Sequence, residues 1–331
     1  MRRLVAFAVA GMTCLGVVGI GASAQAVVAG ANGRILFTRA ICFSDARRCW
    51  EIVAADPNDS HETLIAGPYR KKVWDDHFIA NWSPDGRAVI FMAQLGRKQK
   101  IWEVNADGTG LHAIWSPPND GTGIDDGPAF TPDGRHIIFT RCCPHPSGYA
   151  LWMIEADGSH LKRVTNEVVP PGVDGPSDNL PQVSPNGKLI AYHRNVVTCS
   201  DPSDCGNRIV TVNIHGGHRV QLTDPAINAS IPNWSPDSKR IVFEMYPPKG
   251  GAEVGIVNAD GTGFRQLTFG NEETFSFAPS FSPDGTKIIF SRFPSTAGSV
   301  DLFTMNPDGS GVTKVTRTAS DELWAQWAAA S

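Results

Sequence analysis

The stretch NWSPDGRAVIF, from Asn81 to Phe91, decides the fold because similar stretches recur along the chain. An apolar anchor, Trp82, is followed by a Ser-Pro-Asp-Gly turn and then by alternating apolar residues. Proline presets φ in such a turn, Asp tolerates the turn, and glycine supplies a positive φ. The pattern therefore predicts two strands joined by a tight turn. The other copies are AFTPDGRHIIF (Ala129–Phe139), QVSPNGKLIAY (Gln182–Tyr192), NWSPDSKRIVF (Asn233–Phe243) and SFSPDGTKIIF (Ser280–Phe290).

A second hairpin follows each of these stretches. In the first copy, Ile101–Val104 form a predicted third strand, Asp107-Gly108 is a strong hairpin signal, and Leu111–Ile114 form a fourth strand. Each repeat is thus predicted to be a four-stranded antiparallel meander. Such a unit, repeated at a period of roughly fifty residues, is typical of a β-propeller blade.

Each predicted blade has one apolar anchor before its first turn, so the number of anchors predicts the number of blades. Half repeats at the two ends predict how the ring closes: AQWAAAS (Ala325–Ser331) matches a first half and NGRILF (Asn32–Phe37) a second half. Blade 1 is therefore expected to combine an inner strand near Leu323–Ala329 with three strands from about Arg34 to Ile65. The prediction is an all-β, six-bladed β-propeller whose C-terminal strand joins the N-terminal blade, which removes exposed sheet edges. The six anchors are Trp82, Phe130, Val183, Trp234, Phe281 and Trp327.

The repeat resembles the TolB-type propeller repeat, a WD40-like repeat also called PD40. The resemblance rests on SPDG-x-x-I-x-F, a Trp-bearing strand, ADG-S/T and a strand ending in Leu/Val-Thr, and it covers nearly all of the chain after the leader. TolB carries an α/β domain before its propeller, and we expect no room for one between the leader and Arg34. Similar propellers precede serine peptidases and form some pectate-fragment lyases, so the resemblance implies architecture more than function.

The N-terminus has the features of a secretory signal peptide. Arg2 and Arg3 precede an apolar run from Leu4 to about Ile20, and small residues follow near Ala24 and Ala26. We expect residues 1–26 to be a signal peptide, residues 27–331 to form the propeller, and the destination to be extracytoplasmic: periplasm, cell surface or secreted. The alternative is an uncleaved membrane anchor, since the run is marginal for a span of about 20 residues. After cleavage we expect no stable membrane span.

Six cysteines remain after cleavage removes Cys14, and each lies between the second and third strands of a blade. Cys42 with Cys49, and Cys199 with Cys205, would each close a short loop as a disulfide, which suits an oxidising compartment. Adjacent Cys142 and Cys143 are expected to stay free or to pair with another loop. A metal site is the alternative, but no Cys-x-x-Cys pair appears.

The two faces of the predicted ring differ. The Ser-Pro-Asp-Gly and Asp-Gly turns share one face, while long irregular loops and the mature cysteines share the other, which makes the latter the better candidate for recognition. Acidic residues precede five of the inner strands there and are predicted to crowd toward the channel mouth as a site for a cation such as calcium. The alternative is that these acids cap loops and accept backbone hydrogen bonds. The candidate binding residues at this mouth are Asp76, His77, Asp126, Asp178, Glu273 and Asp321.

The formal net charge of −4 and the lack of a basic block argue against a nucleic-acid partner. No G-x-S-x-G elbow or phosphate-binding loop appears, and the histidines are too scattered to assemble a metal cluster. We therefore expect a non-catalytic monomer that binds a protein, peptide or glycan of the cell envelope, without a cofactor. The alternatives are a metal-assisted lyase or hydrolase, in which Asp76, His77, Asp126 and Asp321 converge on an ion in the channel, and a purely structural envelope component.

Overall fold

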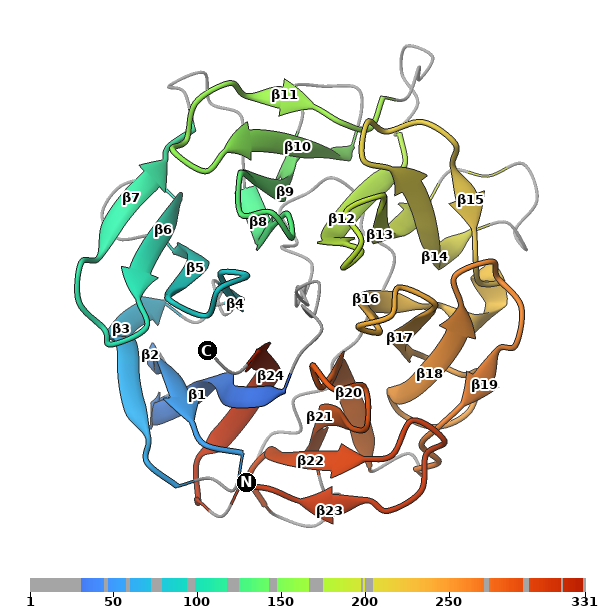
Figure 1. Cartoon of the computed structure of the whole chain (residues 1–331). Coiled ribbons are helices and arrows are strands. Elements are labelled where there is room, and N and C mark those ends of the chain that lie inside the picture. Colours follow the sequence, from blue (N-terminus) through green and yellow to red (C-terminus); the bar gives the residue numbers. More distant parts are fainter. Residues whose placement is uncertain are drawn as a thin grey trace.

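Six four-stranded antiparallel sheets stand around a common axis (Figure 1), as the repeat predicts. The computed structural model describes residues 31–44, 47–57, 60–72, 79–93, 99–117, 125–142, 148–166, 175–197, 199, 205–270, 274–293, 298–316 and 318–329. The predicted leader lies outside these residues. We number the blades from the one that contains β1.

The strands of each blade are given from the axis outward. Blade 1 comprises β24 (Asp321–Ala329), β1 (Asn32–Ser44), β2 (Arg47–Ala55) and β3 (Thr63–Lys72). Blade 2 comprises β4 (Ala80–Trp82), β5 (Ala88–Ala93), β6 (Lys100–Asn105) and β7 (His112–Trp115). Blade 3 comprises β8 (Asp125–Phe130), β9 (His136–Cys142), β10 (Tyr149–Glu155) and β11 (Lys162–Arg163).

The remaining blades follow the same order. Blade 4 comprises β12 (Ser177–Val183), β13 (Leu189–Val196), β14 (Gly206–Asn213) and β15 (Val220–Gln221). A short 3-10 helix, η2 (Pro225–Ile227), leads into blade 5, which comprises β16 (Ser230–Trp234), β17 (Arg240–Met245), β18 (Glu253–Asn258) and β19 (Arg265–Gln266). Blade 6 comprises β20 (Phe275–Phe281), β21 (Ile288–Phe293), β22 (Asp301–Met305) and β23 (Thr313–Lys314).

The two ends of the chain share blade 1, which confirms the predicted closure. Strand β24 pairs with β1 in antiparallel register, with Trp327 opposite Ile35 and Glu322 opposite Arg39. Figure 1 shows the two strands side by side at the base of the ring. Blade 1 also departs from the prediction: β3 continues past Ile65 to Lys72, because its last residues keep pairing with the start of β2.

The Ser-Pro-Asp-Gly turns are held by their own side chains. Ser83 Oγ donates to Asp85 Oδ1 at 2.6 Å and accepts from Ala88 N at 2.9 Å, so one hydroxyl closes the hairpin. The hydrogen bond from Ser83 is the main cause that lowers the pKa of Asp85. In blade 5 the sequence has Ser238 where glycine is usual, and this residue adopts the required positive φ of 60°.

Glycines in the turns between third and fourth strands let these hairpins pack closely on the preceding blade. A Cβ built on Gly158 would lie 2.2 Å from Ile114 O, and one on Gly216 would lie 1.9 Å from Val164 O. Both glycines also have positive φ, of 85° and 87°. The sequence signal for a hairpin is therefore also a signal for close contact between neighbouring blades.

Buried amide side chains link consecutive inner strands around the axis. Asn81 Nδ2 of β4 donates to Pro128 O of β8 at 2.6 Å. Asn233 Oδ1 of β16 accepts from Phe281 N of β20 at 3.0 Å. Both amides are fully buried, so the residue before the apolar anchor serves the contact between blades.

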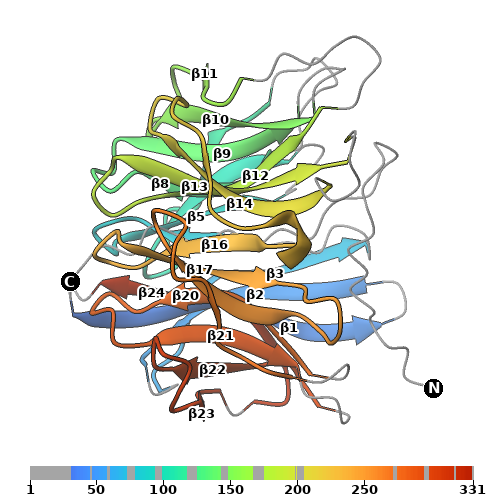
Figure 2. The same cartoon turned by 90° about the vertical axis from the view of Figure 1, so that its right-hand side faces the viewer.

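Strands run between two faces, which Figure 2 shows from the side. The turn face carries the hairpin turns between first and second strands and between third and fourth strands. The loop face carries the connections between second and third strands and those between blades. The Ser-Pro-Asp-Gly and glycine-bearing turns described above belong to the turn face.

Removing β24 tests the closure of the ring. A chain that ends at Ser320 exposes the edge of β1 and loses the apolar side chains of β24. We predict that its melting temperature falls by at least about 10 °C and that it associates in solution. Calorimetry and analytical ultracentrifugation measure both effects, and adding a synthetic peptide of residues 321–331 should restore part of the loss. An unchanged melting temperature with a monomeric species would contradict the closure.

Candidate functional site

Three of the acids predicted at the channel mouth belong to strands and not to loops. Asp126, Asp178 and Asp321 lie at the beginning of the inner strands β8, β12 and β24. The inner strands start earlier than expected because a bulge before the apolar anchor extends their pairing toward the loop face. Asp76, His77 and Glu273 lie outside the described residues, so their convergence stays a prediction.

Each of the three described acids already has a partner within the chain. Asp178 Oδ1 lies 2.8 Å from Arg194 Nη1, and both side chains are almost completely buried. Asp321 Oδ1 accepts from Val300 N at 2.8 Å, and Asp126 Oδ1 accepts from Gly127 N at 2.7 Å. These contacts favour the alternative to a cation site, in which the acids accept hydrogen bonds from groups of the protein itself.

Arginines from the second strands oppose the first residues of the inner strands, and the sequence analysis missed them. Arg194 pairs across the sheet with Asp178, and Arg141 lies opposite Asp125. The Arg292 side chain instead donates to Ser276 Oγ at 3.0 Å. A repeated pattern could have revealed these arginines, since each stands two residues after the aromatic residue that ends the repeat: FTR (37–39), FTR (139–141), YHR (192–194) and FSR (290–292).

Aromatic rings line the guanidinium groups between blades. The Arg141 guanidinium carbon lies 5.2 Å from the ring centroid of Trp115 in blade 2 and 5.4 Å from that of Trp152 in its own blade. Such cation–π contacts stabilise a desolvated cation. Since Arg141 is only 5% exposed, its charge is used within the protein and not presented to a ligand.

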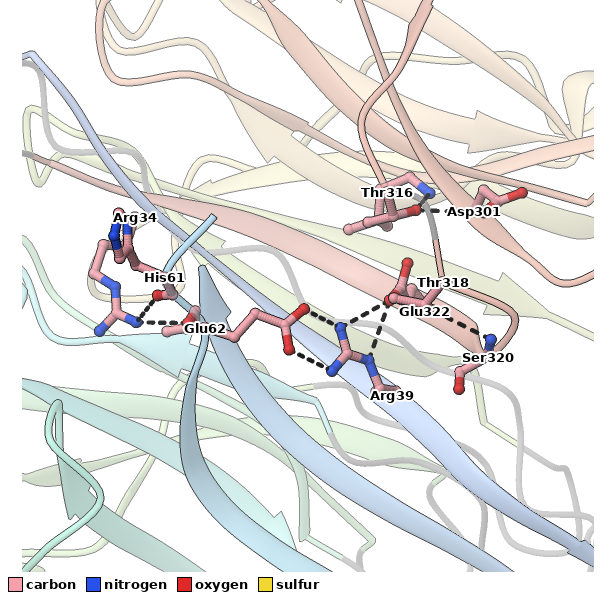
Figure 3. A network of polar contacts seen from close by, with 11 residues as sticks. Arg34, Arg39, His61, Glu62, Asp301, Thr316, Thr318, Ser320 and Glu322 are labelled. Carbon is pink, nitrogen blue, oxygen red and sulfur yellow. Dashed lines mark hydrogen bonds and ion pairs between the residues drawn. The ribbon is translucent and has the colours of Figure 1, made fainter. Parts of the chain in front are cut away.

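The fourth arginine, Arg39, joins the two ends of the chain (Figure 3). Its Nε and Nη2 donate to Glu322 Oε1 of β24 at 3.1 and 2.9 Å. On its other side Nη1 donates to Glu62 Oε2 at 2.7 Å, and Nη2 contacts the second Glu62 oxygen. Thr318 Oγ1 adds a hydrogen bond of 2.8 Å to Glu322. The inner and outer parts of blade 1 are thereby tied by one guanidinium.

The two carboxylates of this cluster respond differently to it. The hydrogen bond from Arg39 lowers the pKa of Glu62, which is partly exposed. Burial raises the pKa of Glu322, whose side chain is completely covered, even though Arg39, Thr316 and Thr318 oppose that shift. The cluster is therefore a structural ion-pair network at the ring seam.

Apolar side chains form a collar around the axis near the loop face. They come from the inner strands of five blades or from the residue just before them, belong to one continuous buried cluster, and are between 1% and 9% exposed. In blade 3 Gly127 holds the corresponding position. The collar residues are Ile79, Leu180, Ile231, Ala278 and Trp324. An apolar collar at this level is a poor environment for a hydrated cation.

Collar residues adopt an unusual backbone conformation. Leu180, Ile231, Ala278 and Trp324 have positive φ between 51° and 55°, which is rare for a residue with a branched or bulky side chain. The inner strand bulges at this residue, which frees its N–H from the usual ladder.

A side chain from the preceding blade's second strand accepts the freed N–H in three blades. Thr140 Oγ1 accepts from Leu180 N at 2.9 Å, and Ser291 Oγ accepts from Trp324 N at 3.1 Å. Glu244 is the third such residue: its Oε2 accepts from Ala278 N at 3.3 Å, and Tyr246 Oη donates to its Oε1. Of these three acceptors, Glu244 alone is an ionisable acid.

Burial governs the protonation of Glu244, which is 4% exposed. Burial raises its pKa to about 7, against the opposing hydrogen bonds from Tyr246 and Ala278. Burial likewise raises the pKa of Tyr246, so the phenol remains a donor. The contact between blades 5 and 6 therefore contains a group that titrates near neutral pH.

Cysteine positions agree in part with the predicted pairs. Cys199 and Cys205 form a disulfide with a Cα–Cα distance of 5.7 Å. Cys42 and Cys49 are direct cross-strand partners of β1 and β2, and their disulfide stays a prediction. Cys143 lies outside the described residues, so the fate of the pair Cys142 and Cys143 stays a prediction as well.

Exposed apolar side chains remain on the loop face. Phe269, in the connection from β19 to β20, is 78% exposed, and Ile41 and Val197, near the loop-face ends of second strands, are 41% and 36% exposed. Within the described ranges, no three side chains of His, Cys, Asp or Glu come together as a metal site. Nor does that part of the chain contain a helix long and apolar enough to span a membrane.

No family model matches the chain. Among solved structures, TolB from Acinetobacter baumannii is similar with a TM-score of 0.69 and 19% identity, over 90% of this chain and 67% of that one. The chain has a TolB-like β-propeller fold. At this identity, the likeness establishes the fold alone.

Two curated sequences are also similar to this chain. The uncharacterized protein Atu1656 of Agrobacterium fabrum is 27% identical over 173 residues, which are 50% of this chain and 54% of that protein. The Tol-Pal system protein TolB of Anaeromyxobacter dehalogenans is 28% identical over 140 residues, which are 42% of this chain and 29% of that protein. The matches thus cover about half or less of these relatives' own lengths.

The pair of Asp178 and Arg194 can be tested as a structural unit. We predict that Asp178→Asn, which leaves the buried guanidinium without its charged partner, lowers the free energy of unfolding by about 3 kcal/mol. The double variant Asp178→Leu with Arg194→Met should be more stable than the single variant, because neither charge is then buried alone. Urea unfolding measures both. A change below about 0.5 kcal/mol in Asp178→Asn would show that the carboxylate is not structural.

The raised pKa of Glu244 should make the free energy of unfolding depend on pH. Because its pKa is raised from 4.5 to about 7 on folding, folding takes up a proton between these values. The stability from that proton is complete below about pH 4.5 and is lost as pH rises through about 7. We predict that between about pH 5 and 8 the wild type loses roughly 2–3 kcal/mol relative to Glu244→Gln. Urea unfolding of both proteins measures the difference, and parallel pH profiles would contradict the assignment.

Proposed function

We propose that this chain is an extracytoplasmic, non-catalytic propeller that binds a protein or peptide of the cell envelope through its loop face. The observation that carries the proposal is the combination of a buried apolar collar at the axis with channel-mouth acids that are held by internal partners. This arrangement supports recognition on the surface of the ring in preference to chemistry inside it.

Exposed side chains on the loop face support a protein ligand over a glycan. Phe269, Ile41 and Val197 present apolar surface on a rigid scaffold. The cores of protein interfaces are enriched in aromatic side chains and poor in charge. The disulfide between Cys199 and Cys205 fixes one connection on this face and favours an oxidising compartment.

The name of one curated relative supports the proposed location outside the cytoplasm. This relative, matched over 42% of this chain, is named as a protein of the Tol-Pal system. Together with the predicted signal peptide at residues 1–26, this supports a role outside the cytoplasm. Whether this chain acts in the same system depends on its loop face, since the likeness concerns the scaffold.

Variants on the two faces test the proposal against a matched control. The loop-face variant combines Ile41→Ser, Val197→Ser and Phe269→Ser. The control combines Leu111→Ser, Phe264→Ser and Val312→Ser, whose side chains are 42% to 43% exposed at the turn-face ends of outer strands. Each immobilised protein is offered the same envelope extract, and bound proteins are quantified by mass spectrometry.

We predict that wild type and control capture the same main partner and that the loop-face variant retains less than about a tenth of it. Equal melting temperatures of the three proteins show that the fold is intact. Capture that the control abolishes and the loop-face variant leaves unchanged would move the binding surface to the turn face and overturn the proposal.

A further inference from the structure

The fourth strand of blade 1 is unusually long. Strand β3 has 10 residues, whereas the fourth strands of the other blades have between 2 and 4. The last residues of β3 pair with the first residues of β2, which in turn pair with the end of β1. Figure 2 shows these three strands reaching farther toward the loop face than the strands of blade 6 beside them. Blade 1 therefore extends a three-stranded end past the neighbouring blade.

Five basic residues come together at this end of the sheet. Arg47 stands opposite Lys72, Arg48 stands opposite Lys71, and Arg70 precedes the two lysines on β3. The two basic runs lie far apart in the sequence, and neither is a basic block by itself. Because β2 pairs with β3, the fold combines them into one cluster, which we call the basic end of blade 1.

Like charges stand across from one another in the basic end. Residues directly opposite in an antiparallel pair have Cβ atoms about 4.5–5.5 Å apart, and like charges at such positions destabilise the sheet. On the other side of β2, the residues opposite Arg47 and Arg48 are Ser44 and Phe43, so no acid of the described ladder compensates the charge. A bound anion would relieve this repulsion.

The positive charge of the basic end exceeds the negative charge that flanks it in the sequence. Residues 45–48 and 69–77 contain five arginines and lysines and three aspartates, which gives a net charge of +2 (five minus three). The acids deeper in blade 1 are used elsewhere, since Glu62 and Glu322 form ion pairs with Arg39 and Glu51 stands opposite it. The basic end is therefore complementary to an anionic partner.

The basic positions belong to both faces of the sheet. Successive residues of a strand alternate between faces, so Arg47 and Lys72 share one face, and Arg48 and Lys71 share the other. An acidic protein would contact one face of a projecting end, whereas a layer of lipid headgroups would surround both. Ile41 lies on β1 near the same end and is 41% exposed, which adds an apolar side chain that the headgroup layer can accommodate.

We propose that the basic end of blade 1 docks on the surface of an anionic lipid bilayer, with lipid phosphates around Arg47, Arg48 and residues 70–72. Basic clusters are attracted to anionic headgroups, and salt screens this attraction. The choice of a membrane as the anionic surface rests on the proposed extracytoplasmic location. Docking in this way would turn the loop face toward the bilayer.

Co-sedimentation with lipid vesicles tests the proposal on residues 27–331, which contain every described strand and lack the predicted signal peptide. The anionic vesicles contain equal parts of phosphatidylglycerol and phosphatidylcholine, and the control vesicles contain phosphatidylcholine alone. At about 50 mM salt we expect at least roughly tenfold tighter binding to the anionic vesicles, and at about 500 mM salt we expect this preference to be lost. Absence of binding, or equal binding to both kinds of vesicle, overturns the proposal.

Charge reversal locates the contact with the vesicles. In Arg47→Glu combined with Arg48→Glu, each glutamate stands opposite a lysine, so the melting temperature should not fall while vesicle binding weakens at least about tenfold. The matched control is Arg87→Glu combined with Arg135→Glu, which changes the charge equally at two exposed positions of the turn face. Its binding should stay within about twofold of wild type. Unchanged binding of the first variant overturns the site.

A labelled DNA duplex of about 20 base pairs tests whether the partner is a lipid surface or a nucleic acid. At equal phosphate concentration and about 50 mM salt, we expect the duplex to bind at least roughly tenfold more weakly than the anionic vesicles. Binding of DNA that is as tight or tighter overturns the assignment to lipid. Capture of an envelope protein is measured separately with the loop-face variant described above, so either proposal can fail alone.

Discussion

The pairing of β24 with β1 is the constraint on which the rest of the structure depends. Each blade packs only on its neighbours, so an open ring would leave a sheet edge exposed and the packing face of blade 6 uncovered. The hydrogen bonds of this shared sheet are reinforced by Arg39, which bridges Glu322 on the last strand and Glu62 beside β3. Apolar contact adds to the seam, because Trp50 of β2 lies 6.4 Å from Trp324 of β24 between ring centroids.

Closure around an axis also determines where polar chemistry can occur. Six inner strands surround the axis, and in five blades an apolar residue in or just before the inner strand joins one buried cluster, the apolar collar. The acids that begin these strands then lie beside second-strand arginines or backbone donors such as Val300 N. The exposed apolar groups of the loop face, such as Phe269, are therefore the surface that we propose for recognition.

The sequence predicted the scaffold well, because Ser-Pro-Asp-Gly and Asp-Gly encode local turns that form in any context where strands can pair. It also predicted the split blade from the two half repeats. It placed Asp178 in a loop, however, since nothing local shows that the strand extends past a bulge at Leu180. The residue before proline is usually extended with negative φ, whereas the left-handed form of Leu180 depends on packing at the axis and on the hydrogen bond from its N–H to Thr140 in the preceding blade. The arginine partners were visible as a repeated aromatic-x-Arg pattern, but their role depends on pairing across the sheet.

Hydrogen exchange measured by mass spectrometry tests the central claim most directly, because it reports the protection of both ends of the chain in the unmodified protein. If β24 and β1 form one sheet, peptides covering 321–329 and 32–44 should exchange together, as slowly as peptides from β12 and β13 inside blade 4. Peptides from 321–329 that exchange at the rate of an unstructured terminus, while β12 and β13 stay protected, would contradict the account.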